Sequence, residues 1–245
     1  MPEQPRGRHT GSREATNTAD LDLGTIETIR DVLIRWGAEN YREFPWRAPE
    51  QPWHGLTAEI LLQRTRAQSV IPVYLKFTNR FPTPLDLATA SVEEIEDVIR
   101  PLGLRWRAPL LKRLGDTLQR LYGEVPETEK ALRKLPGVGP YAAGAYLSLH
   151  ANKRSTIIDA NIVRFVGRLM DRPTDAESRR KKWVRDVVDA LTPGDEVRNF
   201  NYALLDFTME ICAPKPHCDK CPVGEQLCAY KHRLSVGSVT PDETD

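Results

Sequence analysis

Hydrophobic residues recur at intervals of three and four along most of this chain. Two clear series are Ile26, Ile29, Leu33 and Trp36, and Leu110, Leu111, Leu114, Leu118 and Leu121. Residues three or four apart share one face of an α-helix, so each series predicts an amphipathic helix. Because strand-like alternation is nearly absent, the pattern predicts an all-α fold.

Signals for the ends of helices divide this pattern into many short helices. Ser91 followed by Glu94 forms a capping box, and Gly103 stands where the helix that begins there should end. Gly123 is placed to close the helix over 110–122, and Thr128 to cap the next one. We therefore expect helices joined by connections of a few residues.

The two ends of the chain lack this periodicity. Residues 1–24 are rich in Arg, Gly, Thr, Glu and Pro, and residues 233–245 are similar, so both predict disordered tails. The N-terminus has no apolar centre of a signal peptide, and no apolar run is long enough to cross a membrane. We expect a cytoplasmic protein whose 245 residues, 40% of them hydrophobic, form one large domain or two modest lobes.

The formal net charge of +1 neither requires nor excludes a polyanionic partner, because binding depends on where basic residues cluster. Two basic clusters are Arg100, Arg105, Arg107, Lys112 and Arg113, and Arg179, Arg180, Lys181 and Lys182. Each cluster has two interpretations, a contact with DNA phosphates or a solvated helix face.

A very tight turn, Pro136-Gly137-Val138-Gly139, separates the helical stretches 129–135 and 141–150. Glycine permits positive φ and a close approach of the backbone to another surface. The first amides of the following helix point outward and can hold an anion such as a DNA phosphate. An ordinary helix-helix turn is the alternative interpretation.

Asp159 stands at the entrance of an apolar-periodic helix about twenty residues beyond this turn. Aspartate is among the best N-cap residues, so capping is the simplest interpretation. A fixed carboxylate can also stabilise positive charge that develops on a sugar during bond cleavage. The two roles are compatible.

All four cysteines fall in one short segment. They are Cys212, Cys218, Cys221 and Cys228, with gaps of 5, 2 and 6 residues. Because no other cysteine exists in the chain to pair with them, the concentration predicts a metal site. Four thiolates suit either a tetrahedral zinc ion or a [4Fe-4S] cluster.

The turn with its flanks, LPGVGPYAAGAYLSL, resembles the hairpin of the helix-hairpin-helix DNA glycosylase superfamily, which includes endonuclease III and MutY. The segments IIDANIVRFVGR and NYALLDF and the order of the cysteines extend the resemblance from about residue 40 to residue 230. It implies that Gly137, Val138 and Gly139 grip the DNA backbone and that Asp159 is the catalytic aspartate. It also favours a [4Fe-4S] cluster over zinc, although the family's usual gaps are six, two and five.

The resemblance assigns roles to two further regions. Family members that also cut the strand carry a lysine at the position of Tyr141, so this chain is expected to be monofunctional. Tyr141 is expected to stack on or hydrogen-bond the flipped base, and a tyrosine that only packs in the protein is the alternative. The segment 57–65 resembles one in MutY-like enzymes that holds a catalytic glutamate, here Glu59, and residues inserted into the base stack, here Gln63 or Arg64. A surface glutamate favoured by the helix dipole is the alternative for Glu59.

The motifs AEILLQRT, LPGVGPYAA and IIDANIVRFVGR are most similar to the Mig-type thymine-DNA glycosylases. That similarity implies removal of thymine or uracil opposite guanine from double-stranded DNA by a monomer. A MutY-type adenine glycosylase is the nearest alternative, but the sequence ends soon after Cys228, without room for MutY's C-terminal recognition domain. A non-catalytic DNA-binding iron-sulfur protein and an electron-transfer protein are alternatives from other classes.

The expected architecture has two helical lobes with DNA between them. A six-helix lobe over 44–153 carries the hairpin. Residues 25–43 together with 154–232 form the second lobe, which carries the cysteines. Tyr141 and Asp159 would then meet at the cleft between the lobes.

Overall fold

The computed structural model describes residues 21–237, and this part of the chain is helical without any β-strand. The α-helices are α1 (Leu23–Glu39), α2 (Pro52–Leu61), α3 (Ala67–Arg80), α4 (Pro84–Thr89), α5 (Val92–Ile99), α6 (Ala108–Leu121), α7 (Glu129–Leu132), α8 (Pro140–Ala145), α9 (Ala160–Leu169), α10 (Lys182–Leu191), α11 (Val197–Glu210) and α12 (Ala229–Ser235). Short 3-10 turns are η1 (Pro45–Arg47), η2 (Arg100–Leu102), η3 (Arg105–Arg107) and η5 (Ser178–Arg180), and η4 (Tyr146–His150) is π-helical. The predicted all-α class is confirmed.

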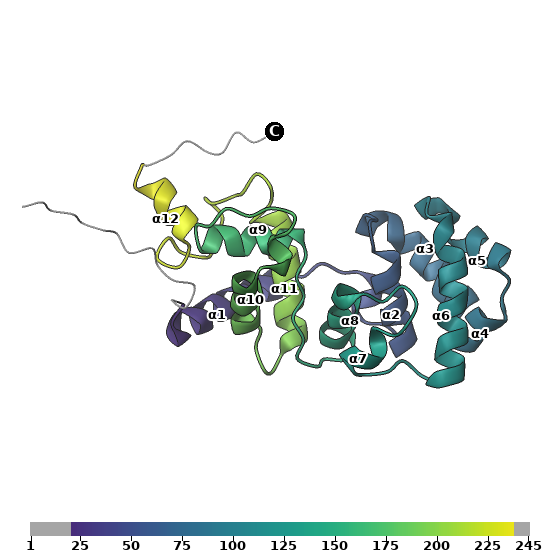
Figure 1. Cartoon of the computed structure of the whole chain (residues 1–245). Coiled ribbons are helices and arrows are strands. Elements are labelled where there is room, and N and C mark those ends of the chain that lie inside the picture. The colour runs from purple at the N-terminus through teal and green to yellow at the C-terminus, as the bar shows by residue number, and fades with distance from the viewer. Residues whose placement is uncertain (1–20, 238–245) are drawn as a thin grey trace, which may run out of the picture.

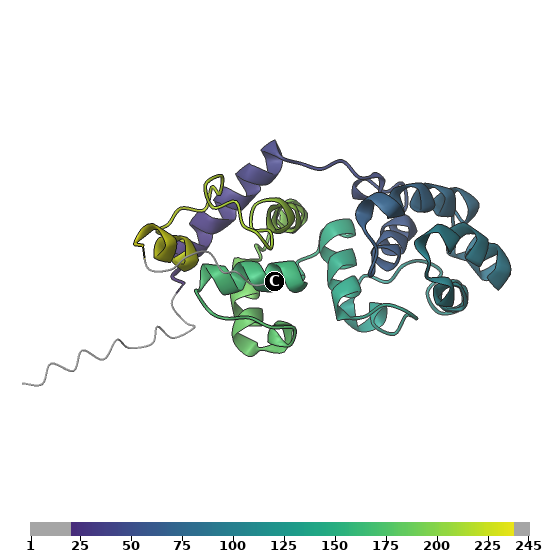
Figure 2. The same ribbon diagram turned by 90° about the horizontal axis from the view of Figure 1, so that it is seen from above.

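The helices form two groups, which are separate in both views of Figures 1 and 2. One group contains α2 to α8 around a core of buried hydrophobic residues drawn from 46–147. The other contains α1 and α9 to α12 around a second core drawn from 26–36 and 145–223. We propose that these groups are the two predicted lobes. The range 44–153 holds seven α-helices where six were expected, because α7 is a single turn.

Both predicted tail boundaries need correction. Helix α1 begins at Leu23, inside the predicted tail 1–24, because the Asp22 side chain caps it by accepting the Thr25 amide at 2.8 Å. Helix α12 continues to Ser235, inside the predicted tail 233–245. Residues 1–20 and 238–245 lie outside the described part of the chain.

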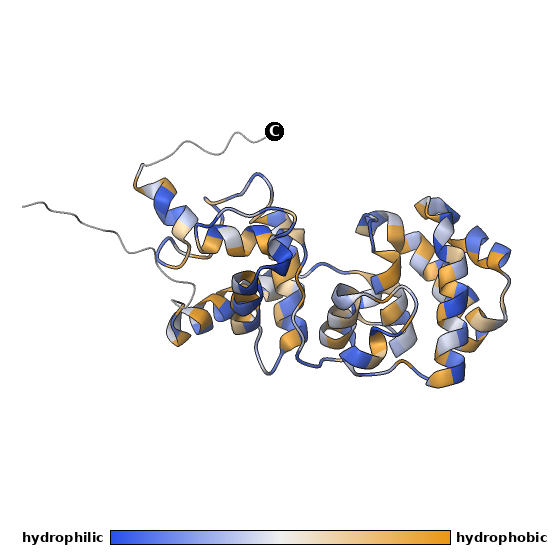
Figure 3. Cartoon of the chain, viewed as in Figure 1, coloured by the Kyte–Doolittle hydropathy of each residue, from blue (hydrophilic) through white to orange (hydrophobic). Residues whose placement is uncertain are grey.

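The predicted helix signals act as expected. The Ser91 hydroxyl accepts the Glu94 amide at 3.1 Å, and the Glu94 carboxylate accepts the Ser91 amide at 2.8 Å. Thr128 caps α7, while Gly103 and Gly123 have φ values of +70° and +71° just beyond their helices. Figure 3 shows hydrophobic and hydrophilic residues alternating along the helices, as amphipathic packing requires. No helix of residues 21–237 is long and apolar enough to span a bilayer.

A buried ion pair joins the two groups of helices. The Arg47 guanidinium in η1 donates to both carboxylate oxygens of Asp206 in α11, at 2.8 and 2.7 Å. Its carbon lies 4.4 Å from the centre of the Tyr202 ring. Because a buried charge is costly without its partner, this pair specifies one arrangement of η1 against α11.

Candidate active site

The predicted hairpin lies between α7 and α8. Gly137 has φ +80°, and a Cβ at this residue would overlap the Leu110 side chain, so the turn requires glycine here. Gly139 caps α8 with φ −84° and ψ −179°, which is extended backbone open to any residue. The expected positive φ at Gly139 is therefore wrong. A Cβ at Gly139 would meet no atom within 4 Å, so the backbone is open to approach from outside.

Val138 has a packing role in the turn. Its side chain is buried in the first core, and its amide donates to the Leu135 carbonyl at 3.1 Å. That amide is consequently used within the turn and is not offered to a phosphate. Among the three predicted DNA contacts of the hairpin, Gly137 and Gly139 are the ones whose surroundings suit the role.

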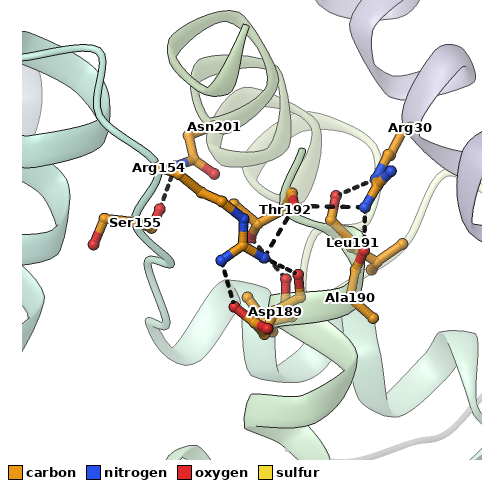
Figure 4. Close-up of polar contacts among 9 residues, drawn as sticks. Arg30, Arg154, Ser155, Asp189, Ala190, Leu191, Thr192 and Asn201 are labelled. Atoms are coloured by element: carbon orange, nitrogen blue, oxygen red, sulfur yellow. Dashed lines mark hydrogen bonds and ion pairs between the residues drawn. The ribbon is translucent and has the colours of Figure 1, made fainter. Parts of the chain in front are cut away.

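The segment that delivers Asp159 runs from the end of η4 to α9 and is anchored on both sides (Figure 4). Arg154 donates to the Asp189 carbonyl at 2.9 Å and pairs with its carboxylate at 3.0 Å, at the C-terminal end of α10. Asn201 of α11 donates to the Ser155 carbonyl at 3.2 Å. Arg30 of α1 binds further carbonyls at the same end of α10, so that several long-range contacts fix this part of the second lobe.

Asp159 is half-buried and caps α9. One carboxylate oxygen accepts the Ile162 amide at 2.8 Å, and the other accepts the Asn161 side-chain amide at 3.1 Å. The capping role predicted from sequence is confirmed. The same contacts hold the negative charge in one place, as a catalytic role would require.

Tyr141, Glu59 and Asp159 come together where the two groups of helices meet. Burial raises the pKa of the Tyr141 hydroxyl far above its usual value, and the charges of Glu59 and Asp159 raise this pKa further. Yet 36% of the Tyr141 surface remains accessible. The Tyr141 side chain is therefore close to both carboxylates and still partly accessible, as contact with a flipped base would require.

Glu59 lies near the C-terminal end of α2, not at the head of a helix as the sequence interpretation assumed. Every residue from Trp53 to Leu61 is buried, and Glu59 itself is only 5% exposed. The alternative of a surface glutamate stabilised by a helix N-terminus is therefore wrong.

His150 is a residue of this site that no sequence signal indicated. Its Nε2 lies 2.8 Å from Glu59 Oε1, and its side chain is 1% exposed. The two residues are 91 positions apart, so a spacing rule cannot find the pair. Only the packing of η4 against α2 brings them together.

Gln63 and Arg64, the predicted wedge, stand on the turn after α2. The Gln63 side chain donates to the Gly137 carbonyl at 3.1 Å, which links this turn to the hairpin. Arg64 is exposed and has φ +57°, a conformation that is strained for a non-glycine residue and concentrates at functional sites. The Arg107 guanidinium donates to the carbonyls of Leu61 and Gln63 and thereby supports the turn.

Neither basic cluster is an open row of free cations. Arg107 is 1% exposed, so its assignment to a phosphate-binding face is wrong. Other members pair with neighbouring carboxylates: Arg100 with Asp97, Arg105 with Glu96, Lys112 with Asp116, Arg180 with Glu177, Lys181 with Asp175 and Lys182 with Asp186. Their surroundings agree better with solvated helix faces.

The four cysteine side chains line one cavity beside α9 and α11. Burial, together with the charges of the other three cysteines, raises the pKa of Cys228 to about 11. Arg168 and Lys231 line the same cavity, and Arg168 Nη1 lies 3.6 Å from Cys212 Sγ. Clustered thiolates in such a place need bound cations, so the donor set fits a metal centre. Within residues 21–237, no three His, Cys, Asp or Glu side chains are already arranged to hold one metal ion.

The all-α fold places a glycine hairpin between α7 and α8, with Tyr141 just after it and near two carboxylates. The model of the HhH-GPD superfamily of base excision DNA repair proteins matches residues 57–186. The chain belongs to this superfamily, and the resemblance noted from its motifs is confirmed.

Individual relatives are similar over most of the chain. The thymine/uracil-DNA glycosylase of Pyrobaculum aerophilum is 37% identical over 215 residues, which cover 82% of this chain and 91% of that protein. A solved structure of a thermostable thymine-DNA glycosylase has 33% identity and a TM-score of 0.79, covering 86% of this chain and 98% of that one. The adenine DNA glycosylase of Rattus norvegicus is 30% identical over 235 residues, 89% of this chain but 45% of that protein.

Proposed function

We propose that this protein is a monofunctional DNA glycosylase that removes thymine or uracil mispaired with guanine. It flips the base from the duplex and hydrolyses the N-glycosidic bond. The observation that carries the proposal is that the charges of Glu59 and Asp159 both act on the partly exposed Tyr141, within an HhH-GPD fold. The similarity to thymine/uracil-DNA glycosylases of nearly equal length supports the choice of base.

Asp159 acts on the sugar. Positive charge develops on the sugar as the base departs, and a carboxylate held by two hydrogen bonds stabilises that charge without having to reorganise. Glu59 lies deeper, on buried α2, where a carboxylate can orient the attacking water. The two acidic groups thus have separate tasks.

Tyr141 determines where the reaction stops. A phenol has no amine to attack the sugar carbon, so the Schiff base that leads to strand cleavage does not form. The product is an abasic site in an intact strand. The exposed part of Tyr141 is available to contact the flipped base.

The group of helices α2 to α8 binds the DNA backbone. The open backbone at Gly139 and the tight turn at Gly137 receive the phosphates of the damaged strand. Arg64, exposed on its strained turn, fills the gap left by the flipped nucleotide, while Gln63 ties that turn to the hairpin. One hydrogen bond therefore couples the wedge to the clamp.

The cysteines Cys212, Cys218, Cys221 and Cys228 hold a [4Fe-4S] cluster. When bound, the cluster crosslinks the loop and so has a structural part. Arg168 joins the loop to α9 by donating to the carbonyls of Ala213 and Pro214 at 2.6 and 2.8 Å. Because Asp159 caps the N-terminus of α9, the loop supports the helix that positions the catalytic carboxylate.

The base preference is tested with duplexes that contain T·G, U·G, A·8-oxoguanine or T·A pairs, each treated with alkali after incubation. We expect strand breaks in T·G and U·G duplexes only, and none before alkali. Breaks only at adenine opposite 8-oxoguanine would favour the adenine glycosylase. Tight binding without breaks in any duplex would favour a non-catalytic DNA-binding protein.

Two further measurements test the remaining parts of the proposal. Borohydride treatment during the reaction should trap no protein-DNA adduct, and a stable crosslink would contradict monofunctional chemistry. Metal and acid-labile sulfide analysis of the purified protein should find iron with sulfide. Zinc without sulfide would refute the cluster while leaving the glycosylase proposal intact.

A further inference from the structure

The imidazole of His150 touches the Glu59 carboxylate and has no part in the mechanism above. Nε2 lies 2.8 Å from Oε1, and the two side chains are 1% and 5% exposed. The Arg198 guanidinium donates to the His150 carbonyl at 2.9 Å. The ring also stacks on Tyr146, with centroids 6.0 Å apart and an interplanar angle of 29°. Both backbone and ring of His150 are consequently held in place.

Helix α2 is shaped to receive this imidazole. Gly55 lies one turn before Glu59, on the same face of the helix. A Cβ on Gly55 would come within 2.6 Å of His150 Cγ and 2.7 Å of Nδ1. The glycine therefore makes the space in which the ring can reach Glu59. This contact, and not backbone conformation, accounts for a glycine inside α2.

The surroundings assign one tautomer to His150. Nδ1 is buried and has no hydrogen-bond partner in the described part of the chain. A proton on Nδ1 would leave a buried donor unpaired, which is costly. A proton on Nε2 avoids this cost and lets His150 donate its hydrogen bond to Glu59.

We propose that His150 is a positioning residue that holds the Glu59 carboxylate in one orientation. By occupying Oε1, it fixes the rotamer of Glu59 and leaves Oε2 to orient the attacking water. A carboxylate that accepts this hydrogen bond is suited to accept a proton from water and not to donate one to the base. This inference rests on the proposed function, because it assigns to Glu59 one task in base release.

The test measures single-turnover release of thymine from a T·G duplex. Replacing His150 by leucine (H150L) removes the donor and should slow release roughly 10- to 100-fold, as expected for losing a hydrogen bond to a charged group. Glutamine (H150Q) can place an amide N–H near the position of Nε2, so it should recover the rate to within about threefold of wild type. A leucine and a glutamine variant that are equally slow would overturn the proposal.

A double-mutant cycle with E59Q separates positioning from general stability. If His150 acts through Glu59, H150L should change the residual rate of E59Q by less than about twofold. An H150L effect that persists undiminished in E59Q would refute the inference.

His54 provides a matched control on the same helix. It is 6% exposed, and its Nε2 lies 3.2 Å from the Pro82 carbonyl and not from Glu59. H54L and H150L each remove one buried hydrogen bond, so H54L should also lower the melting temperature. Because the hydrogen bond of His54 goes to Pro82 and not to Glu59, H54L should leave the release rate within about twofold of wild type.

A second variant keeps His150 and moves it. Alanine at position 55 (G55A) displaces the ring and should slow release by a factor similar to that of H150L, with no further loss when the two changes are combined. Wild-type release with H150L or with G55A would exclude the role. Failure of the wild-type protein on every duplex would refute the proposed function itself, and this role with it.

Discussion

Replacing Asp159 by asparagine removes one negative charge from the site and keeps the shape of the side chain. Asparagine caps a helix about as well as aspartate, so the hydrogen bond with the Ile162 amide is expected to survive. The change therefore separates the charge of Asp159 from its structural role.

The expected size of the effect follows from the position of the carboxylate. A unit charge about 4 Å from the developing sugar cation, at an effective dielectric constant near 20, contributes about 4 kcal/mol. Losing that interaction should slow base release by about a thousandfold. The free energy of unfolding should fall by only about 0.3–1 kcal/mol, through the lost interaction with the α9 dipole.

The assay follows single-turnover release on a T·G duplex, with duplex binding and thermal unfolding measured on the same preparations. Asp22, which caps α1 through the Thr25 amide at 2.8 Å, provides the matched control. Asparagine at position 22 should leave release unchanged. Release by the Asp159→Asn variant within about tenfold of wild type would remove Asp159 from the mechanism.

Three further predictions concern stability and DNA binding. Arg107→Leu leaves the carbonyls of Leu61 and Gln63 unpaired, so it should lower the unfolding free energy by about 3 kcal/mol and weaken mismatch binding. The control Arg105→Leu breaks an exposed ion pair and should cost less than about 1 kcal/mol, so equal melting temperatures of the two variants would contradict the prediction. Gly137→Ala strains a positive φ and pushes a Cβ into Leu110, so it should lower the unfolding free energy by about 2 kcal/mol or more and reduce duplex affinity. In the control Gly123→Ala the φ is also positive but the Cβ meets no atom, so the loss should be about 1 kcal/mol and the affinity unchanged. Asp206→Asn removes the charged partner of the buried Arg47, so denaturant titrations should show the unfolding free energy lowered by about 3–5 kcal/mol. A loss below about 1 kcal/mol would contradict this.

Much of the site could be predicted from sequence where the signal is local. The turn at Gly137, the cap at Asp159 and the cysteine segment are each defined by a few neighbouring residues. A family resemblance supplied the role of Glu59. Its depth was not predicted, because the burial of α2 on all sides depends on what packs around it.

The amino-acid order by itself determined the helical class, the helix caps and the superfamily, because periodicity and capping depend on residues within one or two turns of each other. Tertiary structure alone decided that His150 reaches Glu59, that Arg107 turns inward to support the wedge, and that Arg47 joins the lobes through Asp206. Each of these contacts links residues more than forty positions apart. Such pairs form only when whole helices pack, and no local pattern records which side chains will then meet.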